Sequence, residues 1–108
     1  MGLTKTEEFT KTQNELASMA KALGHPARIA ILQFLMKSKS CVCGEIVDEL
    51  PLSQSTVSQH LSELKKAGLI KGDIDGPSVC YCIDEKAWNK AKKMISELFE
   101  SYESTNCC

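Results

Sequence analysis

The spacing of apolar residues changes partway between positions 53 and 84, and this change constrains the fold more than any other feature of the chain. Ser53 is a common residue at a helix start, and apolar residues then recur on one helix face, at Val57, Leu61 and Leu64. After Gly68, the segments "LIKGDID" and "SVCYCID" carry β-branched or aromatic residues at alternate positions, on either side of residues 76–77, Gly-Pro. The sequence therefore predicts a helix between Ser53 and Gly68, followed directly by a two-stranded hairpin.

Three further helices are predicted ahead of this unit. Thr4 and Glu7 have the spacing of a capping box, and the apolar pattern after them predicts a helix over residues 5–23. Pro26 suits the first position of a second helix, and "ARIAILQFLMK" is apolar nearly all round, which places that helix in the middle of the core. The segment "GEIVDEL" predicts a short third helix that Pro51 closes.

The C-terminal segment "EKAWNKAKKMISELFESY" predicts a fifth, amphipathic helix. Its apolar stripe consists of Trp88, Ala91, Ile95, Leu98 and Tyr102. A chain of 108 residues has room for about one domain, so we expect residues 1–108 to form a single unit with a loose tail at about 103–108. The order of elements is that of a winged helix-turn-helix domain, which is mainly α, with five helices and a two-stranded β-hairpin as the wing.

Charge and composition exclude several classes of protein. The formal net charge is −1, so a nucleic-acid partner would have to meet a local basic patch. The chain has no run of 18 apolar residues and its polar N-terminus does not resemble an export signal, so we expect a cytoplasmic protein with no membrane partner. There is no CxxC dithiol and no candidate Ser-His-Asp set, which argues against an enzyme.

The outer face of the predicted fourth helix favours DNA binding. A helix that enters the major groove needs small hydrogen-bonding side chains near its N-terminus and cations for the phosphates. The chain supplies amides and hydroxyls at Gln54, Ser55, Thr56, Ser58, Gln59 and Ser62, and positive charge at Lys65, Lys66 and Lys71. A merely solvated face more often carries Glu and Lys. His60 lies toward the helix interior, where we expect a hydrogen-bonded structural histidine rather than a sensor or ligand.

Six cysteines fall in three close pairs: Cys41 and Cys43, Cys80 and Cys82, Cys107 and Cys108. Because no export signal is present and the helices supply a core, we expect reduced thiols, which indicate metal or redox chemistry. Small buried core residues are the alternative. A thiol-redox or persulfide sensor remains open, as does a structural zinc module built from the first two pairs, although two CxC pairs do not have the usual knuckle spacing.

The segments "LGHPARIAIL", "LPLSQSTVSQHLSELKKAGLI" and "VCYCI" resemble the ArsR/SmtB family of winged-helix regulators over residues 14–100. The "CVC" motif resembles the metal-sensing box of its arsenite- and cadmium-responsive members. The resemblance implies a homodimer packed through its first and last helices, which represses transcription by binding operator double-stranded DNA without a cofactor. It also implies release when a thiophilic ion, arsenite or antimonite, cadmium or lead, binds cysteine thiolates.

Soft thiolates suit such ions, and a helix N-terminus favours the thiolate form. Cys41 and Cys43 are separated by about 200° on a regular helix, so binding one ion to both would distort the first turn of the third helix and move the fourth. Family members of the arsenite type have a third cysteine where Ile46 stands here. We expect the tail, Cys107 or Cys108, to supply the third ligand, with Cys80 or Cys82 as the less favoured source.

Overall fold

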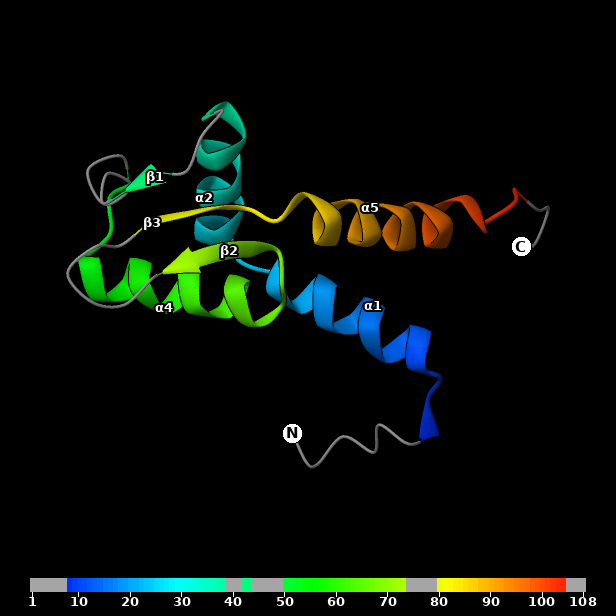
Figure 1. Cartoon of the computed structure of the whole chain (residues 1–108). Coiled ribbons are helices and arrows are strands. Elements are labelled where there is room, and N and C mark those ends of the chain that lie inside the picture. Colours follow the sequence, from blue (N-terminus) through cyan, green and yellow to red (C-terminus); the bar gives the residue numbers. More distant parts are fainter. Residues whose placement is uncertain (1–7, 39–41, 44–49, 74–79, 105–108) are drawn as a thin grey trace.

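The computed structural model describes residues 8–38, 42–43, 50–73 and 80–104. Within these residues the chain forms four helices and three short strands (Figure 1). Their order is α1 (Lys11–Ala22), α2 (Pro26–Lys37), β1 (Val42–Cys43), α4 (Gln54–Lys66), β2 (Ile70–Asp73), β3 (Cys80–Ile83) and α5 (Glu85–Glu100). The predicted third helix covers residues 44–50, of which 44–49 lie outside the described residues; Leu50 is half-buried and lies in a bend, not in a helix.

Helix α1 begins later than its sequence pattern predicts. Thr10 is the N-cap: its hydroxyl accepts from the Gln13 backbone N–H at 3.0 Å, and the Gln13 side-chain oxygen accepts from the Thr10 N–H at 3.0 Å. This is a complete capping box. The predicted start at residue 5 is therefore wrong for residues 8–10, while Thr4 and Glu7 lie outside the described part of the chain.

Helix α2 begins at Pro26, as predicted, with His25 as its N-cap. The His25 Nδ1 accepts a hydrogen bond from the Ala27 N–H at 3.0 Å. The helix buries Ile31, Leu32 and Leu35 in the core, whereas Ile29 and Met36 are exposed. The expected position in the middle of the core thus holds for one face of α2, and the apolar residues on the other face have no cover within the described chain.

Helix α4 has the predicted cap and the predicted inner face. The Ser53 hydroxyl accepts from the Thr56 N–H at 3.3 Å, which satisfies one of the N–H groups that the first turn leaves unpaired. The buried residues are Val57, His60, Leu61 and Leu64. The helix ends before Gly68, whose φ of 86° lies in the left-handed region that glycine adopts without strain.

The wing is part of a three-stranded antiparallel sheet with the order β1-β3-β2. β2 and β3 form the predicted hairpin. β1 pairs with the other edge of β3, with Val42 opposite Tyr81 and Cys43 opposite Cys80. The expected position of Cys43 at the first turn of a third helix is therefore wrong, because Val42 and Cys43 are extended and give β3 a second hydrogen-bonded neighbour.

Gly72 allows β2 and β3 to come close together. Its φ is 121°, and a Cβ added at this position would overlap the Cys80 carbonyl oxygen and lie 2.8 Å from the Tyr81 Cα. Tyr81 itself is 1% exposed and is among the largest fully buried side chains of the core. A residue without a side chain at position 72 thus lets β2 pack closely against β3, the strand that contains Tyr81.

Helix α5 starts at Asp84, whose carboxylate accepts from the Ala87 N–H at 3.2 Å. α1 and α5 project together from the rest of the molecule (Figure 1). Lys90 on α5 reaches Glu15 on α1 with 3.5 Å between the charged atoms. The predicted apolar stripe is buried or half-buried through Ala91 and Ile95, but Leu98 and Tyr102 are exposed, so the outer half of α5 is not covered by the described part of this chain.

Candidate nucleic-acid interface

The outer face of α4 carries most of the residues predicted to bind DNA. Gln54, Ser55, Ser58 and Gln59 are exposed, while Thr56 and Ser62 are half-buried. Lys65 and Lys66 are exposed in the last turn of the same helix, and Lys71 is exposed on β2. The structure therefore presents the amides and hydroxyls near the N-terminal half of α4 and the lysines at its C-terminal end.

The hydroxyl groups at the start of α4 contact one another. The Ser53 Oγ lies 3.2 Å from the Ser55 Oγ and 3.0 Å from the Thr56 Oγ1. These local contacts orient Ser55 and Thr56 at a helix N-terminus, where the unpaired N–H groups and the helix dipole also attract phosphate. The first turn thus suits contact with the DNA backbone, while Ser58 and Gln59 lie one turn further along and suit contact with base edges.

Glu63 is a carboxylate that the sequence reasoning did not include in this face. Its side chain lies 3.7 Å from the Lys66 Nζ, with both side chains about half or more exposed to solvent. Such an exposed pair contributes little stability and leaves the lysine able to exchange partners. Glu63 therefore reduces the local positive charge without removing Lys66 as a phosphate contact.

Arg28 fixes the inner face of α4 against the first two helices. Its Nε donates to the His60 Nδ1 at 3.2 Å, and its Nη1 donates to the carbonyl oxygens of Lys21 at 3.1 Å and Ala22 at 3.3 Å. Since Arg28 is always protonated, the His60 Nδ1 must be unprotonated to accept. His60 is thus the hydrogen-bonded structural histidine that the sequence predicts, whereas the role of Arg28 was not predicted.

The environment of His60 keeps its ring neutral. Burial is the largest cause that lowers the pKa of His60 below 6.5, followed by the charges of His25 and Arg28. The His25 ring lies 4.3 Å from the His60 ring, centroid to centroid. A proton on His60 would remove the acceptor for Arg28 and place two cations side by side inside the fold.

The predicted cysteine site is described only in part. Cys41, Cys107 and Cys108 lie outside the described residues, and Cys43 is described by its backbone alone. Cys80 belongs to a disulfide, which contradicts the expectation of reduced thiols at this position, whereas Cys82 retains its thiol and is half-buried. Among the described side chains, no three His, Cys, Asp or Glu residues are grouped closely enough to hold a metal ion.

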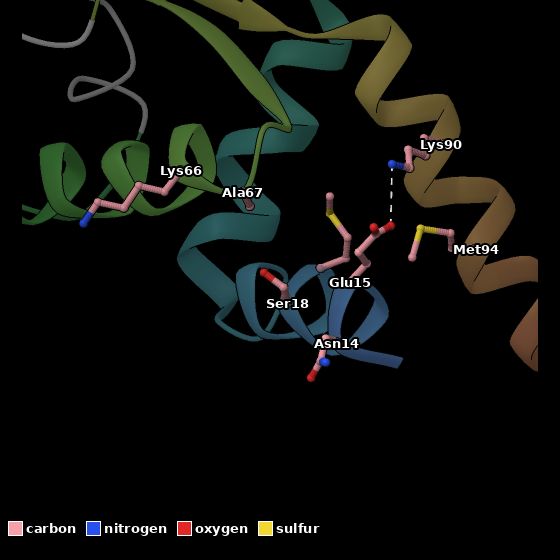
Figure 2. A pocket seen from close by; sticks show the side chains of 8 residues that line it. Asn14, Glu15, Ser18, Lys66, Ala67, Lys90 and Met94 are labelled. Atoms are coloured by element: carbon pink, nitrogen blue, oxygen red, sulfur yellow. Dashed lines mark ion pairs between the residues drawn. The ribbon is translucent and has the colours of Figure 1, made fainter. Parts of the chain in front are cut away.

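A shallow pocket of about 350 Å³ lies between α1, α5 and the end of α4 (Figure 2). Asn14, Glu15, Ser18, Met19, Lys66, Ala67, Lys90 and Met94 line it. Its Glu15 carboxylate is already within ion-pair distance of Lys90 and Lys11. The pocket is separate from the exposed amides of α4, and Lys66 is the residue that it shares with the predicted DNA-binding set.

Comparisons with known proteins agree with this geometry. Residues 25–71, which span α2, α4 and the start of the wing, match the family described as bacterial regulatory protein, arsR family. The chain is 41% identical over 83 residues to an uncharacterized HTH-type transcriptional regulator of Methanocaldococcus jannaschii, MJ1325, which covers 76% of this chain and 92% of that protein.

Two further relatives are named for their effect on transcription. The chain is 46% identical over 63 residues to the HTH-type transcriptional repressor SmtB of Mycobacterium tuberculosis, covering 58% of this chain and 46% of that protein. It is 31% identical over 100 residues to the transcriptional activator HlyU of Vibrio cholerae, covering 93% of this chain and 89% of that protein.

No helix in the described ranges is both long and apolar enough to span a membrane. The capped helix, its polar outer face, the hairpin wing and these matches together show that the chain belongs to the ArsR/SmtB family of helix-turn-helix transcriptional regulators, a family of DNA-binding proteins and not of enzymes.

Proposed function

We propose that this protein is a homodimeric repressor that binds operator double-stranded DNA in the cytoplasm and leaves it when an effector reacts with its cysteine thiolates. The observation that carries the DNA-binding part is the division of α4 into two faces. Val57, Leu61 and Leu64 hold one face in the core, while Ser58 and Gln59 are exposed on the other. A helix fixed in this way can enter the major groove without losing its own packing.

Each side chain of the outer face has a distinct part in this proposal. Gln59 has an amide that can donate to and accept from one adenine edge, and Ser58 can pair with any base. Lys65, Lys66 and Lys71 neutralise phosphates, which gives affinity without sequence preference. The Gln59 amide should therefore contribute most to which DNA sequence is preferred, and the lysines should determine how strongly any DNA is held.

A dimer through α1 and α5 is supported by the apolar side chains exposed there. Phe9 precedes α1, and Leu98, Phe99 and Tyr102 stand at the end of α5, with exposed fractions of 53% for Phe9 and Leu98, 73% for Phe99 and 75% for Tyr102. Large apolar side chains gathered at one end of a molecule favour association with a partner. A second copy would cover this surface and place two α4 helices on one palindromic site.

For the effector we propose a thiophilic ion, arsenite or antimonite, or cadmium or lead, bound by Cys41 and Cys43. Cys107 and Cys108 stay the candidates for a third ligand from the tail. The strand register, however, now supports Cys80, because its backbone is directly opposite that of Cys43. In the reduced protein this neighbour needs no movement of the tail. DNA binding itself needs no cofactor in this proposal.

A thiol-redox repressor is the second candidate, and the disulfide at Cys80 favours it. The same disulfide counts against a structural zinc module of Cys41, Cys43, Cys80 and Cys82. A disulfide sulfur is not a thiolate and does not hold zinc in a four-thiolate site.

The test of the proposed function is a binding titration with the full-length, reduced protein and fluorescent duplexes selected from a random pool. Gln59→Ala should weaken binding to the selected duplex by about 5- to 150-fold and leave binding to random DNA unchanged, since a bidentate base contact is worth roughly 1–3 kcal/mol. Lys65→Ala should weaken both and reduce the salt dependence. Gln33→Ala, an exposed glutamine on α2, is the matched control. Equal losses from Gln33→Ala and Gln59→Ala would show that α4 does not read bases.

The dimer and the effector are tested in the same assay. Phe99→Glu should yield a monomer by sedimentation and lose most operator affinity, whereas Glu97→Gln, an exposed residue on the same helix, should not. Arsenite, antimonite, cadmium and lead are then titrated against the protein–DNA complex, with zinc for comparison. Release by one of these ions that is abolished in Cys41→Ser or Cys43→Ser supports the metal site. Release that persists in the double variant contradicts it.

A further inference from the structure

The strands β1 and β3 bring two cysteines that are far apart in the sequence to the same rung of the sheet. Cys43 is opposite Cys80, and the neighbouring rung pairs Val42 with Tyr81. Directly opposite residues in an antiparallel pair have Cα atoms about 4.5–5.5 Å apart. This separation is within the range of about 4.4–6.8 Å that a disulfide spans.

Cys80 is a disulfide cysteine, and the strand register favours Cys43 as its partner. Cys82, two residues along the same strand, retains its thiol and is therefore not that partner. Cys43 is the cysteine whose backbone the sheet holds at the required distance, so the bond between the two needs no rearrangement of β1 or β3. The core supports this strand pairing, because the adjacent Tyr81 is 1% exposed and keeps β3 in place.

We propose that Cys43 and Cys80 form a reversible cross-strand disulfide and that hydroperoxides are the oxidant. One thiolate attacks a peroxide oxygen, the O–O bond breaks, and an alcohol or water leaves, which gives a sulfenic acid. The second thiol attacks that sulfur, the S–S bond forms, and water leaves. Two thiols and one hydroperoxide thus become one disulfide, one alcohol or water, and one water, and a dithiol reductant reverses the change.

This pair deepens the proposed function, and its consequence for DNA release rests on that function. Oxidation removes Cys43 as a thiolate, so the oxidised protein should not respond to a thiophilic ion through that residue. The disulfide would tie β1, the strand before α4, to β3, the strand that leads into α5. Independently of it, the Asp84 N–H at the start of α5 donates to the carbonyl of Leu69, which follows α4, at 2.9 Å. The proposed bond thus lies between the strand that precedes α4 in the sequence and the strand that precedes α5.

The experiment uses the full-length chain with Cys41, Cys107 and Cys108 changed to Ser, so that Cys43, Cys80 and Cys82 are the only cysteines left; oxygen added to the four methionines is located by peptide mapping. The reduced protein is treated with hydrogen peroxide and its intact mass is measured. We expect a loss of about 2 Da that a dithiol reductant restores, and a cross-linked peptide joining residues 43 and 80 after digestion. Adding Cys82→Ser, the matched control, should leave both results unchanged, whereas adding Cys43→Ser or Cys80→Ser should abolish the 2 Da loss and give oxygen adducts instead.

Two outcomes would overturn the inference: a cross-link from Cys82 in place of Cys80, or oxygen adducts without any 2 Da loss in a protein whose circular dichroism remains native. Operator binding is measured on the same samples. A protein that forms the disulfide but does not bind DNA specifically would contradict the proposed function and leave the cross-strand pair intact. A protein that binds DNA but forms no Cys43–Cys80 bond would contradict only the inference made here.

Discussion

Replacing Arg28 by Met should destabilise the fold far more than removing a surface charge from the same helix. Arg28 donates to the His60 ring and to two carbonyl oxygens at the end of α1, at 3.1–3.3 Å. The contacts to His60 and Ala22 are partly buried, whereas the contact to Lys21 is exposed to water. Met has a similar length and can keep part of the packing of the side-chain stem, so the change chiefly removes the three hydrogen bonds.

The expected loss is about 2–3 kcal/mol. A hydrogen bond from a charged group contributes about 1.5–3 kcal/mol when it is shielded from water, and a buried acceptor that loses its partner costs about 1–3 kcal/mol. The bonds to His60 and Ala22 are only partly buried, so we count about 1–1.5 kcal/mol for each of them and nothing for the exposed bond to Lys21, which gives this range. For a domain of this size the slope of urea unfolding is about 1–1.5 kcal/mol per M, so the midpoint should fall by about 2 M.

The assay is urea unfolding followed by circular dichroism at one fixed protein concentration, because dimer formation makes the apparent stability depend on concentration. Lys37→Met is the matched control, since Lys37 is exposed in the last turn of α2 and the substitution removes the same charge. A double variant with His60→Leu should lose less than the sum of the two single variants by about 1 kcal/mol, because the Arg28–His60 bond is counted in both. Equal midpoints for Arg28→Met and Lys37→Met would refute the idea that Arg28 holds α4 in place.

Three further predictions concern the start of α4, the histidine on α4 and the wing. Ser53→Ala should lower stability by about 1 kcal/mol in urea, whereas Ser53→Asp should keep the cap but weaken binding to any DNA, because it adds a negative charge where a phosphate approaches. The folded-state pKa of His60 lies below 6.5, so its contribution is fully present above pH 6.5 and decreases as the pH falls toward the folded-state value, by up to about 1.4 kcal/mol per pH unit. Unfolding at pH 5–7.5 should show this slope in the wild type and a smaller one in His60→Gln. Gly72→Ala should destabilise the protein by more than 1 kcal/mol, or unfold it, as measured by thermal melting, because its φ of 121° and the nearby Tyr81 backbone leave no room for a Cβ.

Local patterns predicted α2, α4 and the hairpin because each has a signal within its own residues. Pro26 and Ser53 mark the helix starts, and the alternation around Tyr81 marks a strand. The start of α1 was misplaced because two capping-box spacings occur in succession, Thr4 to Glu7 and Thr10 to Gln13. A local rule cannot choose between such neighbours, since the choice depends on which turn packs against the rest of the fold.

The features missed at the candidate site are those that depend on contacts between distant residues. A two-residue strand such as β1 has no periodic pattern of its own, and it is extended because the edge of β3 supplies its hydrogen bonds. The role of Arg28 could not be predicted, because its partners, His60 and the end of α1, come beside it only in the folded chain. The outer face of α4 was predictable because its character, small amides and hydroxyls opposite an apolar stripe, is contained in one segment.

The position of the sheet explains how a change at a cysteine can affect a helix whose inner face is fixed. Leu61, Leu64 and the Arg28–His60 bond hold α4 in the core, so a signal is most easily transmitted through the chain segments at its two ends. The segment before α4 comes from β1, and the segment after it continues into β2; both strands pair with β3. A disulfide or a bound ion at Cys43 and Cys80 would therefore act where both connections meet, whereas the tail is connected in the sequence to α5 alone. Oxidation or ion binding at the paired residues Cys43 and Cys80 is therefore the more direct way for a thiol reaction to change the orientation of α4.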